Sequence, residues 1–110
     1  MGALIYDGAR VEFDDRVLAH LQVVIVQRLR RHESVLISWF DALQDGDGRS
    51  SVWLSSALPV RFEFATPRPP EIDRAWVQRL AETAAGRSGL LVEDLDGRPV
   101  RALHSTMANG

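Results

Sequence analysis

The sequence predicts an α+β domain, because short β-like runs and two amphipathic helices occupy separate stretches of one small chain. The chain has 110 residues, which gives room for one domain. Its hydrophobic content of 45% and charged content of 25% are typical of a globular domain. We expect the order ββ-α-βββ-α-β, with two helices on one face of a mostly antiparallel sheet. Residues 1–95 are predicted to form this domain, and residues 96–110 a weakly ordered C-terminal extension.

The first predicted element is a β-hairpin over residues 3–13, with Asp7-Gly8 at its turn. The stretch IYDGAR also matches the K-x-D-G-x-R motif of ATP-dependent DNA ligases, except that Ile5 stands where the motif has its lysine. That lysine is the nucleophile that accepts AMP, and all 13 basic residues of this chain are arginine. We therefore interpret the stretch as a hairpin turn, and we judge ligase activity by this route excluded.

A first helix is predicted over residues 16–32, with Asp14 or Asp15 capping its N-terminus. Apolar residues recur at helical spacing along its core face. Ala19, Val23 and Val26 project from the opposite face, where an apolar stripe is uncommon in a monomer. This stripe is our candidate interface, either for a partner chain or for a second layer of the same fold.

Residues 35–40 are apolar on both faces, as a central strand would be, and a turn at residues 45–48 leads to a returning strand at 51–54. Counting back from that turn places Trp39 near Trp53 as a cross-strand pair. The remaining predicted elements are a half-buried strand from Leu58 to Phe64, a second helix capped by Asp73, a strand at 90–92 and a weak strand at 100–103.

Few residues offer catalytic or metal-binding chemistry. The chain has no cysteine, which excludes thiolate nucleophiles and thiolate metal sites, and it has no lysine for a Schiff base. His20, His32 and His104 lack metal-ligand spacing, and we expect them to be solvated or capping residues. The sequence therefore predicts no catalytic site, no metal and no cofactor, although it does not settle whether the protein is an enzyme.

Arginine-rich stretches suggest an alternative in which the protein contacts nucleic acid or another anion. The loop QDGDGRSS offers backbone N–H groups beside an arginine, and further arginines follow the first helix. Against this stand the net charge of −2 and the sequence pI near 5.9, because nucleic-acid binders usually carry a basic excess. The candidate contacts are Arg30, Arg31, Arg49, Ser50 and Arg61.

Five segments of the chain resemble a family of small, uncharacterised actinobacterial proteins whose members often carry the label "ATP-dependent DNA ligase". The segments are LIY, EFDDRVLAHLQVVI, RRHES…SW, GDGRSSVWL and RAWV, and the resemblance covers roughly residues 1–92. It implies shared fold determinants and brings no catalytic residues with it.

We expect a non-catalytic binding or interaction domain that works on an unknown macromolecule or on itself as a homodimer. The alternative is a nucleic-acid-associated accessory protein. No apolar run is long enough to span a membrane, and we expect the protein in the cytoplasm.

Overall fold

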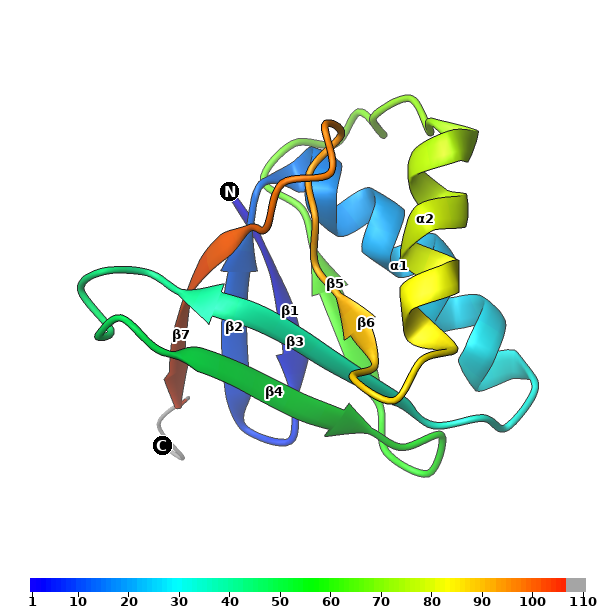
Figure 1. Cartoon of the computed structure of the whole chain (residues 1–110), viewed down its shortest axis with the longest axis horizontal. Coiled ribbons are helices and arrows are strands. Elements are labelled where there is room, and N and C mark those ends of the chain that lie inside the picture. Colours follow the sequence, from blue (N-terminus) through cyan, green and yellow to red (C-terminus); the bar gives the residue numbers. More distant parts are fainter. Residues whose placement is uncertain (107–110) are drawn as a thin grey trace.

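The computed structural model describes residues 1–106 and shows an α+β domain with a seven-stranded sheet (Figure 1). The strand order is β4-β3-β7-β2-β1-β5, with β6 beside β3. The elements are β1 (Gly2–Tyr6), β2 (Ala9–Phe13), α1 (Asp15–Arg30), β3 (Val35–Asp41), β4 (Arg49–Leu54), β5 (Val60–Glu63), α2 (Arg74–Ala84), β6 (Leu90–Leu91) and β7 (Arg101–Thr106).

The sheet is mostly antiparallel, as predicted, and only the pairings of β3 with β6 and with β7 are parallel. The two helices lie together on one side of the strands, and β3 and β4 cross β1 and β2 obliquely (Figure 1). The core lies between the helices and the sheet, and Trp76, Phe13 and Leu18 are among its most buried side chains. The predicted arrangement of two helices against one sheet is therefore confirmed.

The first hairpin is confirmed, with Tyr6 opposite Ala9 and a two-residue loop between them. Asp7 has a φ of 47° and Gly8 a φ of 81°. Two consecutive positive φ values define the type I′ turn, whose twist matches that of the flanking strands. The Asp7-Gly8 pair is thus a fold determinant.

The predicted pairing of Trp39 with Trp53 is wrong. Trp39 lies opposite Ser50 and is buried, whereas Trp53 lies opposite Leu36 and is 61% exposed. The turn is centred between Gln44 and Asp45, further towards the N-terminus than the glycine cluster suggested. A shift of this kind changes the partner of every residue in the hairpin.

Both helices begin where carboxylates cap them. Asp14 accepts a hydrogen bond from the Arg16 amide, and Asp73 accepts one from the Trp76 amide. The expectation that His20 is solvated is wrong, because its ring is fully buried and stacks on Trp76 at 3.9 Å between centroids. The ring also accepts a hydrogen bond from the Asp73 amide and contacts the Arg16 carbonyl, so it joins α1 to α2.

The weak strand predicted at residues 100–103, within the C-terminal extension, overlaps the last strand of the structure. Residues 101–106 form β7, which lies in the middle of the sheet. Its first part pairs with the end of β3, and its second part pairs with β2. Only Ala102 of this strand is buried. Backbone pairing therefore determines where β7 lies, and the hydrophobic pattern of residues 101–106 gives little indication of its position. Residues 107–110 of the predicted extension lie outside the described residues.

Candidate functional site

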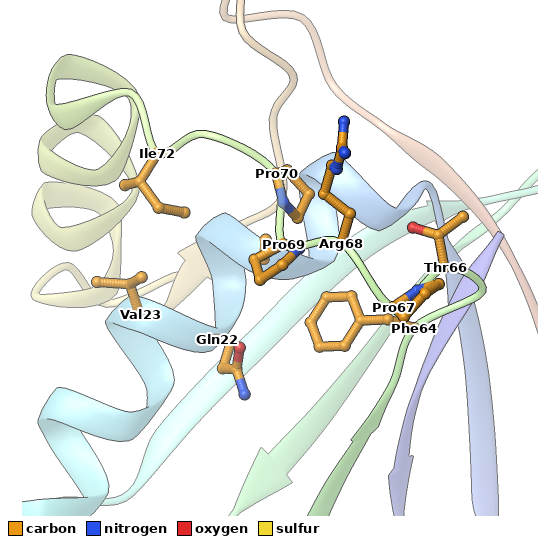
Figure 2. Close-up of a pocket in the computed structure, with 10 residues that line it drawn as sticks. Gln22, Val23, Phe64, Thr66, Pro67, Arg68, Pro69, Pro70 and Ile72 are labelled. Atoms are coloured by element: carbon orange, nitrogen blue, oxygen red, sulfur yellow. The ribbon is translucent and has the colours of Figure 1, made fainter.

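A groove of about 310 Å³ lies between α1 and the segment 64–72, which leads from β5 towards α2. We call it the α1 groove. Figure 2 shows Phe64, Val23 and Ile72 around it, with two prolines of the connecting segment between them. Its lining residues are Ala19, Gln22, Val23, Phe64, Thr66, Pro67, Arg68, Pro69, Pro70 and Ile72.

The wall opposite the helix is built from the sequence TPRPP at residues 66–70. Proline fixes φ, and the residue before a proline avoids the helical region, so the backbone of this bent segment has little conformational freedom. Sequence reasoning treated these residues only as a connection. The signal that could have identified them as part of a site is a proline-rich segment in a chain that also has an apolar stripe on the outer face of its first helix.

Asp15 holds the segment against the start of α1. Its carboxylate accepts hydrogen bonds from the backbone N–H groups of Ala65 and Thr66 and from the Thr66 hydroxyl, at 3.0 to 3.3 Å. The Ala65 N–H is the main cause that lowers the pKa of Asp15, and the Thr66 donors add to it. A hydrogen bond to the charged form favours that form. One wall of the groove is therefore fastened by a charged contact.

The groove itself is mainly apolar. Arg68 is the one charged residue in its lining, and its side chain points away from Phe64 and Val23 in Figure 2. Ile72 is 44% exposed at the end of the groove near α2, although it is a large apolar side chain. Such a surface suits an apolar group of a ligand or partner better than an anion.

The predicted stripe on α1 divides into two parts. Ala19 is buried, and both Ala19 and Val23 line the groove, so the chain's own proline-rich segment forms a partial second layer over them. Val23 and Val26 are half-buried, and Val26 lies outside the groove lining. The groove therefore extends the predicted interface to residues of the connecting segment.

The predicted anion contacts are dispersed over the molecule. Arg30 and Arg31 lie at the end of α1, just before β3 begins, whereas Arg49 pairs with Phe40 near the far end of β3. A strand of this length separates its ends by roughly 20 Å. Arg61 lies on the edge strand β5 and forms an ion pair with Glu63 at 2.7 Å. The fold thus does not gather these arginines into one basic surface, and nucleic-acid contact remains a prediction.

Ser50 lines a second cavity of about 240 Å³, whose lining residues all come from strands. Its hydroxyl donates to the buried Asp41 carboxylate at 2.6 Å, and the His104 ring lies 3.4 Å from the same carboxylate. The acid thus stands between the serine and the histidine. A nucleophilic triad instead has the histidine between the acid and the serine, so that the imidazole takes the serine proton. This arrangement occupies Ser50 and gives it no activating base.

The fold and these surfaces can now be compared with known proteins. The model of a family described as a domain of unknown function, DUF7882, matches residues 1–94. The chain belongs to the DUF7882 family. No curated protein and no solved structure shows a significant match to it. The family match covers both helices and six of the strands, and β7 lies beyond it. Within residues 1–106, neither helix is long and apolar enough to cross a membrane.

Proposed function

We propose that this DUF7882 chain is a non-catalytic interaction domain that holds an apolar segment of a partner protein in the α1 groove. The observation that carries the proposal is the groove itself, in which the half-buried Val23 of α1 faces a proline-rich segment that also contributes the exposed Ile72. A preformed apolar groove binds at lower entropic cost than a mobile surface, because little of it has to be ordered on binding.

The shape of the groove favours a short hydrophobic anchor. Pockets of about 300 Å³ and above hold small ligands or single bulky side chains of a partner. An aromatic or branched side chain that enters between Val23 and Phe64 would contact both walls. Polar groups of the partner would remain beside the anchor, where the side-chain amide of Gln22 lines the groove. The resemblance to proteins labelled DNA ligases adds no catalytic role, since the chain has no lysine to adenylate.

The proposal is tested by selecting binders from a displayed library of random peptides against the purified chain. We expect the selected peptides to share an apolar or aromatic anchor. Val23→Arg should weaken their binding at least about tenfold, because it places a charge in the apolar lining against which the anchor of the peptide would be buried. Ile72→Asp adds a charge to another lining residue of the groove and should weaken binding in the same direction.

Gln27→Arg is the matched control, because it adds the same charge to an exposed position of α1 outside the groove lining. This variant should bind the selected peptides as the wild-type chain does. Circular dichroism melting of each variant verifies that it is folded. Equal binding to the Val23→Arg chain and the wild-type chain, or a selection that returns no binder, would overturn the proposal.

A further inference from the structure

The two edge strands of the sheet differ in how well they are protected. β5 is four residues long, carries Arg61 and Glu63, follows Pro59 directly and leads into the proline-rich segment. Short length, charge and proline are the usual features that prevent an edge strand from pairing with another chain. β4 is six residues long, contains no proline, and has Arg49 as its one charge. No described element covers its outer edge (Figure 1).

The alternation of hydrogen-bonded pairs between β3 and β4 shows which backbone groups of β4 are free to pair with another strand. The Asp41 amide donates to the Gly48 carbonyl, so this opposed pair is hydrogen-bonded. Hydrogen-bonded and non-hydrogen-bonded pairs alternate along an antiparallel ladder. Residues 50, 52 and 54 therefore face β3, and residues 49, 51 and 53 direct their N–H and C=O groups to the open edge.

Exposed apolar side chains lie on β4 and in the loops before and after it. Trp53 on β4 is 61% exposed, Leu43 in the loop before β4 is 72% exposed, and Leu58 in the loop after it is 45% exposed. These are three of the five large apolar side chains that the described surface exposes. Exposed apolar groups beside an unpaired strand mark an association site.

We propose that β4 pairs antiparallel with β4 of a second copy of this chain, centred on Ser51. In this register all three outward-facing residues of each copy take part in the ladder. Arg49 then lies opposite Trp53 of the partner, with both side chains on the same face of the sheet. A guanidinium over the face of an exposed indole is a favourable cation–π contact, and the two-fold axis produces this contact twice.

A second copy fits the strand better than an unrelated peptide, because β4 is complementary to itself. Arg49 and Trp53 are equally distant from Ser51, so the symmetry brings unlike side chains together and separates the two arginines. The same symmetry places the Leu58 end of one copy beside the Leu43 end of the other. An isologous interface requires this kind of self-complementary patch.

Cysteine cross-linking tests the register, since the native chain has no cysteine. Ser51→Cys would place two thiols directly opposite each other, with Cα atoms about 5.5 Å apart, a distance that a disulfide spans. We expect a covalent dimer under mild oxidation. Ser56→Cys is the matched control, because residue 56 is an exposed serine outside β4. In the proposed register the thiols of two copies at position 56 would lie far apart, so this variant should yield no covalent dimer.

Sedimentation equilibrium tests the assembly without a cross-link. The wild-type chain should approach twice its 12.3 kDa mass as its concentration rises. Trp53→Lys should remain monomeric, because it adds a charge to the edge, and Gln78→Lys on the exposed surface of α2 should dimerise normally. A monomer at all concentrations, a persistent dimer in Trp53→Lys, or equal cross-linking at positions 51 and 56 would overturn the proposal. Val23→Arg should leave the mass unchanged, which separates this interface from the α1 groove.

Discussion

Gly8 and Gly89 have similar backbone conformations but different surroundings. Their φ values are 81° and 74°, a region that residues with a Cβ rarely adopt. A Cβ at Gly8 would meet no atom within 4 Å, whereas one at Gly89 would lie 2.4 Å from the Leu36 carbonyl oxygen. Glycine is thus required at position 8 only for the backbone conformation of its turn. At position 89 it is required for its backbone conformation and also because the chain passes too close to β3 to leave room for a Cβ.

Alanine substitutions at these two positions should separate the cost of backbone conformation from the cost of steric contact. Gly8→Ala should lower the free energy of unfolding by about 1–2 kcal/mol, the cost of a left-handed conformation. Gly89→Ala should lower it by about 1–3 kcal/mol more, because the methyl group displaces the Leu36 backbone. Urea denaturation measures both values. Equal losses would show that β6 shifts freely away from β3.

At the scale of the elements, Asp15 connects the start of α1 to the segment that follows β5. Its carboxylate, held by the Ala65 and Thr66 amides, has a pKa below the ordinary value of 3.8. A carboxyl whose pKa is lower in the folded state stabilises the fold fully above its unfolded pKa. That contribution is lost as the pH falls through the folded pKa, so it disappears in acid.

Asp15→Asn should therefore lower the free energy of unfolding at neutral pH. The difference between this variant and the wild-type chain should shrink as the pH falls below 3.8, the ordinary value of the carboxyl pKa. Asp14→Asn is the control, because asparagine caps a helix about as well as aspartate does. Denaturant titrations at a series of pH values measure the effect. If the difference in free energy of unfolding between the two chains stays constant as the pH falls into the acid range, the loss in Asp15→Asn comes from packing and not from the charge.

Local chemistry in the sequence was sufficient to predict several elements. The Asp-Gly turn, the caps Asp14 and Asp73 and the helix periodicities depend on residues within a few positions of one another. The burial of His20 depends on α2, which lies more than fifty residues further along the chain. The α1 groove likewise combines one face of α1 with a segment over forty residues away, and periodicity revealed only the helix side of it.

At the scale of the whole molecule, β7 connects two parts of the sheet. β1, β2 and β5 form one antiparallel group, and β3, β4 and β6 form another. β7 is the strand that pairs with both, through β2 on one side and β3 on the other. Neither strand neighbour is close to β7 in the sequence, so a pattern confined to residues 101–106 could not predict its central place.

Leu103→Pro should therefore disrupt the sheet as a whole. The His104 amide donates to the Asp45 carboxylate, so it points away from β2. Alternation along the ladder then directs the Leu103 amide towards Glu12. Proline at position 103 removes that donor from an interior strand. The free energy of unfolding should fall by about 2 kcal/mol or more, because the Glu12 carbonyl also loses its partner.

Thr106→Pro is the matched control for this prediction. Residue 106 lies opposite Ala9, and the same alternation directs its amide away from β2, so proline there removes no ladder hydrogen bond. Urea denaturation measures the free energy of unfolding of both variants. Amide hydrogen exchange in β1 and in β4 then reports separately on the two groups of strands. In Leu103→Pro the amides of the two groups should exchange at different rates, because the connecting strand is weakened. Uniform protection with unchanged stability would contradict a connecting role for β7.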